Sequence, residues 1–216
     1  MESEIPPSSE WHTPTYVHFY PRCTRRSRLD FRTDDMRSCV LIAVNLPQDK
    51  TNIMTYKIPA QTHIGHVHLK VSDIERSLKF YRDLLGFEVM QYYGDSAVFI
   101  SAGGYHHHIG LNTWHSKGAQ PAPVRAAGLY HVAILYPTRK DLATILKRLV
   151  DEKYPLTGAS DHGVSEAIYL NDPDHNGVEL YWDKPKEQWP VDENGNLVMG
   201  TEALDIDSLF SELDII

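Results

Sequence analysis

The chain has 216 residues, 42% of them hydrophobic, which is enough to bury one good core beside some unpacked segments. Its formal net charge of −8 argues against a general nucleic-acid-binding protein, which would normally present a basic face. No apolar run approaches the roughly 20 residues that a membrane span requires, and the acidic start MESE is unlike a signal peptide. The sequence therefore predicts a cytoplasmic protein without nucleic-acid or membrane partners.

Histidine is the abundant reactive residue of this sequence. Ten of the twelve histidines fall between His63 and His175. The only cysteines, Cys23 and Cys39, lie in the first quarter of the chain, so chemistry further along cannot depend on a thiol or a disulfide framework. Function is therefore expected to depend on the histidines.

Residues 1–53 combine proline, serine and an arginine-rich run without a sustained helical or strand period. This composition predicts an N-terminal extension that is either disordered or the product of an early start codon, since clear patterning begins soon after Met54. A targeting or docking arm is the alternative, and the acidic residues Glu2, Glu4 and Glu10 argue against it.

The first folded unit is predicted to begin with a strand. Residues His63 to Val71 alternate, which places His66, His68 and Lys70 on one face of that strand. Three polar side chains, two of them imidazoles, are therefore expected to point in the same direction.

A helix is predicted directly after this strand. Ser72 and Glu75 form a capping box, and Gly86 suits the C-terminal cap. The apolar stripe of the helix comprises Ile74, Leu78, Tyr81, Leu84 and Leu85. Three short strands then complete a β-α-β-β-β unit over residues 62–115, and they are Phe87–Tyr93, Ala97–Ser101 and His106–Trp114.

A linker of small residues and proline, residues 116–127, leads into the same order of elements over residues 128–183. Leu129–Tyr136 is a predicted strand, and Thr138 begins a helix with Asp141 three residues on. The expected buried face of that helix comprises Leu142, Ile145, Leu146, Leu149 and Val150.

A hairpin completes the second unit. Ala167–Leu170 has strand character, Asp172–Gly177 is dense in turn residues, and Val178–Trp182 is a second strand of aliphatic and aromatic residues. Glu179 is the one acid on that strand. A buried carboxylate without a partner costs several kcal/mol or becomes protonated, so Glu179 is expected to have a partner.

The two units repeat with a period of about 65 residues. Superimposing them places His66 opposite His131, each followed by valine, and such a duplication usually gives two half-domains that share one sheet or barrel. The remaining residues, 184–216, are acidic and are expected to form a surface tail with a short helix at Ile206–Leu213.

These paired units resemble the vicinal oxygen chelate superfamily, which includes glyoxalase I, fosfomycin-resistance proteins and type I extradiol ring-cleaving dioxygenases. The resemblance covers residues 62–182 and is strongest to extradiol dioxygenases of the catechol 2,3-dioxygenase kind. It implies an α+β fold in which two βαβββ modules form one incompletely closed eight-stranded barrel around a divalent metal. The matching segments are GHVHL (Gly65–Leu69), HHHIGL (His106–Leu111), GLYHVAI (Gly128–Ile134), DHGVSEAIYL (Asp161–Leu170) and DPDHNGVELYW (Asp172–Trp182).

The metal ligands expected from this resemblance are His66, His131 and Glu179. Two histidines and one carboxylate from three strands can occupy one face of an octahedral metal and leave the other face open, as non-haem Fe(II) enzymes require. Two neutral imidazoles and one carboxylate leave Fe(II) at net +1, so a catechol monoanion would bring the centre to neutrality. The predicted cofactor is Fe(II), with Mn(II) as the alternative.

The resemblance also implies groups that manage protons. His107 matches the family's acid–base residue, while His162 and Tyr169 match residues that border the substrate. His68 and His108 are expected to face substrate, although His107 and His108 cannot share one face of a strand. The other histidines of this region are expected to be structural or solvated, namely His63, His115 and His175.

The predicted function is extradiol cleavage of a catechol-type ring with O₂. A glyoxalase-like isomerase or lyase is one alternative. It would need a further acidic metal ligand in the segment His106–Trp114, which contains no acid, unless a histidine replaces that ligand. A non-catalytic small-molecule-binding protein is another, although it would not need three aligned ligands. Because well-known extradiol enzymes carry four such units and this chain has two, a second subunit is expected to complete the pocket, which predicts a homodimer.

Overall fold

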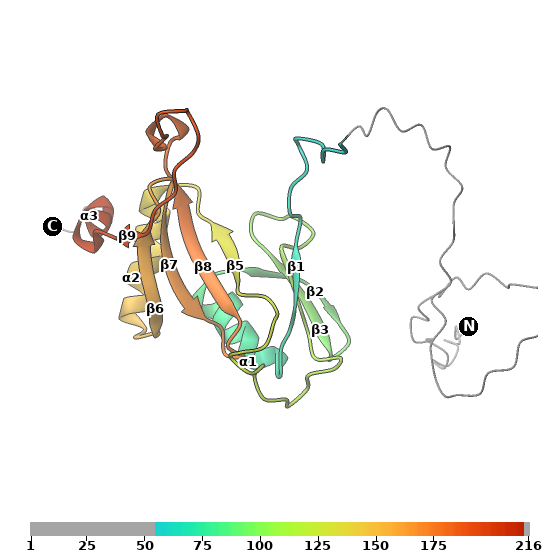
Figure 1. Cartoon of the computed structure of the whole chain (residues 1–216). Coiled ribbons are helices and arrows are strands. Elements are labelled where there is room, and N and C mark those ends of the chain that lie inside the picture. Colours follow the sequence, from blue (N-terminus) through green and yellow to red (C-terminus); the bar gives the residue numbers. More distant parts are fainter. Residues whose placement is uncertain (1–54, 214–216) are drawn as a thin grey trace, which may run out of the picture. The chain divides into compact units, whose positions relative to one another are not determined.

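The computed structural model describes residues 55–213, and it contains the predicted β-α-β-β-β order twice (Figure 1). The N-terminal extension expected over residues 1–53 lies outside the described residues. The mixed α+β class is confirmed, with two sheets of four and five strands.

The first sheet has the strand order β1-β4-β3-β2. β1 runs parallel to β4, and the other neighbours are antiparallel. Alternation along β1 buries Leu69 against the core and leaves His68 exposed on the opposite face. The bounds of the strands are β1 Val67–Lys70, β2 Glu88–Tyr93, β3 Ala97–Ser101 and β4 Ile109–Asn112.

The helix of the first unit is α1 (Ile74–Leu78), which continues as a π-helical segment, η1 (Lys79–Leu84). Its N-cap is Asp73, whose side chain accepts a hydrogen bond from the main-chain N–H of Arg76 at 2.8 Å. The predicted cap, Ser72, lies one residue earlier and instead accepts from the guanidinium of Arg76 at 2.6 Å. The cap therefore moves by one residue because the side chain of Ser72 already has a partner.

The second sheet has the strand order β5-β8-β7-β6-β9. The hairpin predicted at its centre is β7 and β8, which pair in antiparallel register. β6 and β9 were not predicted, because β6 is half polar and β9 has only two residues. The bounds are β5 His131–Leu135, β6 Leu156–Asp161, β7 Ser165–Asn171, β8 Gly177–Asp183 and β9 Glu202–Ala203.

The helix of the second unit is α2 (Arg139–Asp151), and its predicted N-cap is confirmed. Thr138 accepts a hydrogen bond from the main-chain N–H of Asp141 at 3.1 Å. The predicted buried face holds except at Val150, which is 52% exposed. Val150 shares the face of Leu146 and Ala143, four and seven residues earlier, but it lies in the last turn of the helix, which ends at Asp151.

Residues 202–213, within the segment expected to be a surface tail, pack against the rest of the fold. β9 pairs with β6, and Leu204 and Leu209 join the hydrophobic core. Arg139 at the start of α2 donates to the carbonyl oxygen of Ser208 at 3.1 Å. The sequence missed this docking because few apolar residues mark it. The helical elements of the segment are η2 Lys186–Gln188, α3 Ile206–Phe210 and η3 Ser211–Leu213.

The incompletely closed eight-stranded barrel stays a prediction, because the described residues form two separate sheets of four and five strands. β1 ends one sheet and β5 ends the other, and no ladder joins them. The two units are joined instead by one shared hydrophobic core and by hydrogen bonds between them. The hydroxyl of Tyr81 donates to Asp172 at 3.0 Å, and Arg148 donates to the carbonyl oxygen of Leu84 at 2.8 Å.

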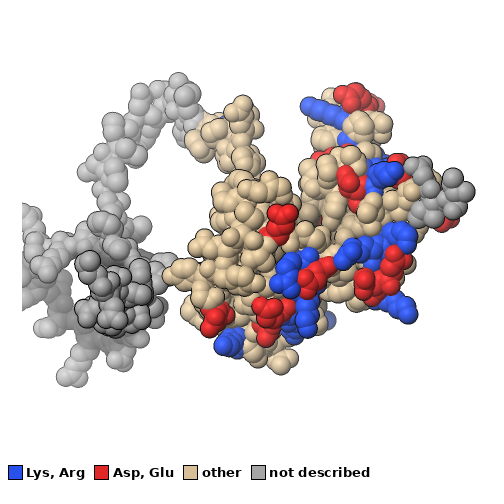
Figure 2. Space-filling model, turned by 180° about the vertical axis from the view of Figure 1, so that it is seen from behind, with Lys and Arg blue, Asp and Glu red and all other residues tan. Residues whose placement is uncertain are grey.

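Acidic and basic side chains are interspersed over the face shown in Figure 2, which does not present a broad basic patch. The ion pairs of the described residues include Arg139–Glu166 and Lys147–Asp151, both with N–O distances of 2.7 Å. Among residues 55–213, no helix has the length and apolar character needed to cross a bilayer.

Candidate functional site

Four of the predicted site residues form one continuous chain of polar contacts on the second sheet. Nε2 of His162 lies 2.7 Å from the hydroxyl of Tyr169, which donates to Oε1 of Glu179 at 3.1 Å. Oε2 of Glu179 lies 2.9 Å from Nε2 of His131. Residues from three strands and one loop are thus brought together.

Strand register explains why these side chains meet. Tyr169 on β7 lies directly opposite Glu179 on β8. His131 on β5 pairs with Gly177, which is two residues before Glu179 and therefore on the same face of the sheet. The partner expected for the acid on β8 is thus provided by both neighbouring strands.

Gly177 lets β5 approach β8 closely. A Cβ atom at this position would lie 2.1 Å from the carbonyl oxygen of Tyr130 and 3.1 Å from Cβ of His131. Any side chain here would therefore push the strand that carries His131 away from Glu179. The left-handed residue of the preceding turn is His175, with φ of 63°, so Gly177 is needed for packing.

The hydroxyl of Tyr169 is held in its protonated form. Burial, followed by the nearby charge of Glu179 and the hydrogen bond to it, raises the pKa of Tyr169 to about 12. Tyr169 can therefore donate a hydrogen bond at neutral pH.

A cavity of about 610 Å³ opens beside this chain of contacts. Three of the predicted site residues line it, together with small and polar side chains. The lining residues are Tyr130, His131, Thr157, Ser160, His162, Tyr169, Leu170, Asn171, Gly177, Val178 and Thr201. Its size is suited to a small organic molecule.

The first sheet carries a second group of predicted residues. The rings of His66 and His107 lie 4.5 Å apart, and the rings of His107 and Phe99 lie 5.0 Å apart. His68 continues this row, with its ring 5.9 Å from Phe99 and 5.3 Å from Trp114. An aromatic row therefore runs from His66 to Trp114.

His107 and His108 precede β4, which begins at Ile109 and not at His106 as predicted, and their side chains have different partners. His107 packs against His66, whereas Nδ1 of His108 lies 3.0 Å from the hydroxyl of Ser101. Burial, followed by the nearby His66, lowers the pKa of His107, which favours its neutral form as a proton acceptor. Of the two, His107 is the one placed to act beside His66.

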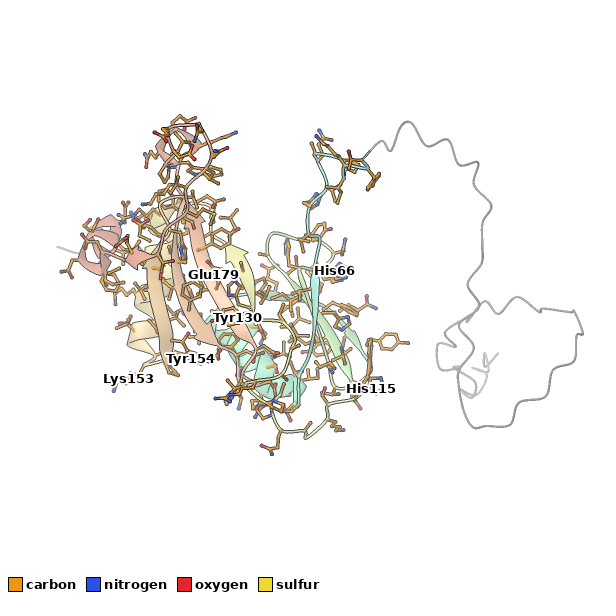
Figure 3. The ribbon with its side chains drawn as sticks, viewed as in Figure 1. His66, His115, Tyr130, Lys153, Tyr154 and Glu179 are labelled. Atoms are coloured by element: carbon orange, nitrogen blue, oxygen red, sulfur yellow. The ribbon has the colours of Figure 1, made fainter. Side chains whose placement is uncertain are left out.

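The predicted three-residue metal centre is not assembled. Among residues 55–213, no three His, Cys, Asp or Glu side chains lie close enough to hold a metal ion. His131 and Glu179 meet on the second sheet, while His66 remains on the first (Figure 3). The physical reason is that no ladder joins β1 to β5.

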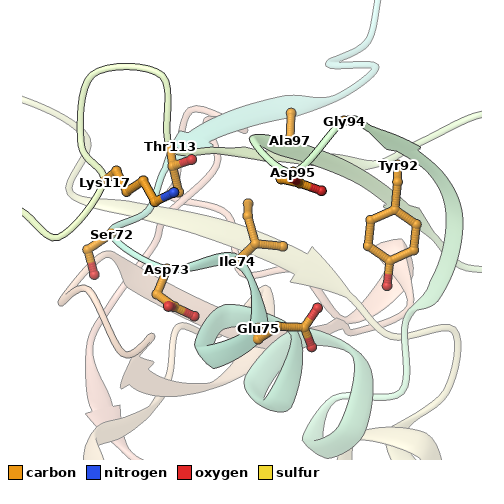
Figure 4. Close-up of a pocket in the computed structure, with 10 residues that line it drawn as sticks. All are labelled: Ser72, Asp73, Ile74, Glu75, Tyr92, Gly94, Asp95, Ala97, Thr113 and Lys117. Carbon is orange, nitrogen blue, oxygen red and sulfur yellow. The ribbon is translucent and has the colours of Figure 1, made fainter.

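A second cavity, of about 310 Å³, lies beside the start of α1 and is lined by none of the predicted site residues (Figure 4). Asp73, Glu75 and Asp95 face it together with Lys117. It contains no histidine, so the candidate site is the larger cavity.

A sequence profile of the Glyoxalase/Bleomycin resistance protein/Dioxygenase superfamily matches residues 63–180, which is more than half of the chain. The chain belongs to this superfamily. The match covers both β-α-β-β-β units and ends at the middle of β8, and it confirms the resemblance inferred from the motifs.

Two dioxygenases illustrate the sequence relationship. A catechol-2,3-dioxygenase of Bacillus subtilis is 42% identical over 156 residues, which are 72% of this chain and 53% of that protein. Biphenyl-2,3-diol 1,2-dioxygenase 3 of Rhodococcus globerulus is 29% identical over 120 residues, which are 56% of this chain and 63% of that protein. The chain thus spans about half the length of the first relative and under two thirds of the second.

Among solved structures, a glyoxalase/dioxygenase from Nostoc punctiforme matches with a TM-score of 0.51. The match covers 62% of this chain and 100% of that one, at 14% sequence identity. At this identity the likeness shows the fold alone. The Glyoxalase/Bleomycin resistance protein/Dioxygenase fold is therefore supported by both sequence and structure.

His131 and Glu179 on the second sheet have the spacing of two adjacent metal ligands. Two adjacent ligands of an octahedral ion with bonds of about 2.1 Å lie about 3 Å apart. The 2.9 Å between Nε2 of His131 and Oε2 of Glu179 matches that spacing. Oε1 of Glu179 is meanwhile oriented by Tyr169, as a metal-binding carboxylate requires.

Two contributors to the candidate site were not predicted. The carbonyl oxygen of Gly200 lies 2.8 Å from Nδ1 of His162, and Thr201 lines the larger cavity. Both belong to the segment expected to be a tail. No periodicity or motif marks either residue, so pattern reasoning had no signal for them.

Proposed function

We propose that this chain is an extradiol dioxygenase that opens a catechol-type aromatic ring with O₂. The observation that carries the proposal is the chain of contacts from His162 through Tyr169 and Glu179 to His131 beside a cavity of about 610 Å³. Both oxygen atoms of O₂ enter the product, and the carbon–carbon bond beside one hydroxyl-bearing carbon breaks. Relatives named as dioxygenases of catechol and of biphenyl-2,3-diol support this substrate class.

The metal donors of the proposal are His131, Glu179 and His66. The first two are already adjacent, and His66 is the imidazole that the duplicated unit places at the corresponding position. When bound, Fe(II) or Mn(II) would hold the substrate oxygens and O₂ together and mediate electron transfer between them. All other roles belong to protein side chains.

Tyr169 binds and orients substrate in this proposal. Its hydroxyl stays protonated because its pKa is raised to about 12, so it can donate a hydrogen bond to a substrate oxygen beside Glu179. His162 contacts the same hydroxyl through Nε2 and can give a proton to it or take one from it. Tyr169 and His162 together can hold one proton beside that substrate oxygen.

His107 is the proposed acid–base residue on the first sheet. Its pKa is lowered by burial and by His66, so it is neutral near pH 7 and can accept the proton of a catechol hydroxyl. It can then return that proton to oxygen when the O–O bond breaks. His68 and His108 are proposed to border the substrate, His68 within the aromatic row and His108 next to Ser101.

Anaerobic reconstitution with Fe(II) or Mn(II), followed by oxygen uptake and absorbance over a panel of catechols, tests the proposal. We expect about one metal ion per chain, as one three-donor site implies, and a yellow ring-opened semialdehyde formed with one O₂ consumed per product. Isomerisation of a methylglyoxal–glutathione adduct without oxygen uptake would instead identify a glyoxalase-like enzyme. Tight catechol binding without either reaction would identify a binding protein.

A homodimer is proposed on the exposed apolar residues around β5. Leu129 is 53% exposed, Tyr130 is 90% exposed and Leu135 is 53% exposed, and a second copy would cover them. Sedimentation should give a dimer, which Tyr130→Glu should weaken. Mixing His66→Ala and Glu179→Ala chains tests which chain supplies His66, because an inactive mixture is expected if all three proposed donors belong to one chain. Recovered activity would mean that His66 is supplied by the partner.

A further inference from the structure

The C-terminal segment 197–213 reaches the candidate site through Gly200. The main-chain N–H of Gly200 donates to the carbonyl oxygen of His162 at 3.1 Å, and the carbonyl oxygen of Gly200 lies 2.8 Å from Nδ1 of His162. Thr201, the next residue, lines the cavity of about 610 Å³. The segment therefore contacts both the backbone and the ring of one predicted site residue.

The contact with Gly200 determines which nitrogen of His162 carries a hydrogen. A carbonyl oxygen can only accept a hydrogen bond, so Nδ1 of His162 must be the donor. In the neutral ring, Nε2 then has the free lone pair, and Nε2 is the atom 2.7 Å from the hydroxyl of Tyr169. The one hydrogen of that hydroxyl is therefore shared between two acceptors, Nε2 of His162 and Oε1 of Glu179, and can be donated to only one of them at a time. The opposite tautomer would place two lone pairs against each other at Gly200.

The segment is fixed in place by contacts remote from the cavity. β9 pairs with β6, and Leu204 and Leu209 are buried in the core. Arg139 donates to the carbonyl oxygen of Ser208 at 3.1 Å and to Glu212 at 3.0 Å. These anchors hold Gly200 against His162 although both Gly200 and its neighbours are exposed.

We propose that the C-terminal segment is a positioning element of the site, in which the main chain of Gly200 sets the tautomer and orientation of His162. It directs Nε2 of His162 toward Tyr169, so that the nitrogen able to exchange a proton faces the hydroxyl beside Glu179. The consequence for catalysis rests on the proposed function, whereas the tautomer does not. The superfamily match ends at residue 180, so the segment lies outside the matched region.

The tautomer can be observed directly by NMR of the full chain with 15N-labelled histidine, with the signals of His162 assigned from their loss in His162→Gln. Gly200→Pro removes the main-chain N–H that donates a hydrogen bond to the carbonyl oxygen of His162. Gly200→Ala is the control, because it keeps this N–H and its Cβ meets nothing within 4 Å. We expect Nδ1–H in the wild type and in Gly200→Ala, and a mixture of tautomers in Gly200→Pro.

A remote variant separates positioning from local damage. Arg139→Lys keeps a positive charge beside Glu166 but loses the fork that holds Ser208 and Glu212. We expect His162 to lose its fixed tautomer here too, and kcat for catechol to fall about tenfold with KM within about twofold. Thermal unfolding confirms that the variant is folded.

An unchanged tautomer in both Gly200→Pro and Arg139→Lys would overturn the proposal. So would a loss of kcat without any change in the His162 signals, since the segment would then act only on stability. If the wild type lacks dioxygenase activity but the tautomer responds as expected, the proposed reaction fails and the positioning role stands.

Discussion

Oε2 of Glu179 and Nε2 of His131 lie 2.9 Å apart, at the spacing of two adjacent metal ligands. In the absence of a metal, a hydrogen must lie between these atoms for the contact to be favourable. A metal ion must displace that hydrogen, which neutral His131 can carry on Nδ1 instead. Calorimetry should therefore detect Mn(II) binding by the wild type, and Glu179→Gln should weaken that binding strongly, because it replaces one of the two adjacent donors.

Metal binding and proton transfer should separate by mutation. His131→Ala should lose most of its metal, because one of two adjacent donors is gone. His107→Phe should keep its metal and lose about 10²–10⁴-fold in turnover, since it removes acid–base chemistry without removing a donor. Metal content by mass spectrometry and oxygen uptake measure the two effects. His175→Ala, in an exposed turn, is the control, and equal metal loss in the first two variants would contradict the role of His107.

Tyr169→Phe should lower kcat by about 10²-fold, which is the usual cost of one lost transition-state donor. Because the pKa of Tyr169 is raised to about 12, its hydroxyl remains protonated at neutral and moderately alkaline pH. The wild-type activity should therefore show no alkaline loss from this residue up to pH about 10. A pH–rate profile of both proteins checks this, and an alkaline limb present only in the wild type would argue against it.

Two substitutions at the connection between β7 and β8 should have opposite effects on the free energy of unfolding. Gly177→Ala should destabilise by about 2–4 kcal/mol, because its Cβ would lie 2.1 Å from the carbonyl oxygen of Tyr130. His175→Gly should stabilise by up to about 1 kcal/mol, because His175 has φ of 63°. Urea unfolding of both variants measures the difference. A neutral Gly177→Ala would show that β5 and β8 can separate freely.

The pair of Asp161 and Lys184 should make stability depend on acid pH. Burial raises the pKa of Asp161, but the hydrogen bonds from Lys184 and Gly163 outweigh it, so the net pKa is lowered. A lowered carboxyl pKa stabilises the fold above the unfolded value near 3.8, and this stabilisation is lost as pH falls through the folded value. Lys184→Met should cost about 1 kcal/mol at pH 7.

The check on this pair is unfolding measured between pH 7 and pH 2. The difference between the wild type and Lys184→Met should shrink as Asp161 becomes protonated below about pH 4. A difference that stays constant with pH would mean that Lys184 contributes through packing of its aliphatic stem alone.

The order of elements and most of the site were accessible from the sequence. Residues His66, His131 and Glu179 could be selected because duplication places two histidines at equal positions and because one acid interrupts an apolar strand. His107 and His108 could not be told apart from the sequence. Both lie before β4, where strand alternation does not apply, so the contact of His107 with His66 had to come from three-dimensional packing.

Local pattern determined the two β-α-β-β-β units, their helix caps and the β7–β8 hairpin, because caps, turns and periodicity act over a few residues. Tertiary structure alone decided that His66 stays apart from His131, that Gly177 lies under Tyr130, and that Gly200 holds His162. The two contacts join residues 47 and 38 positions apart through main-chain carbonyl oxygens, which are common to every amino acid and leave no mark in the sequence.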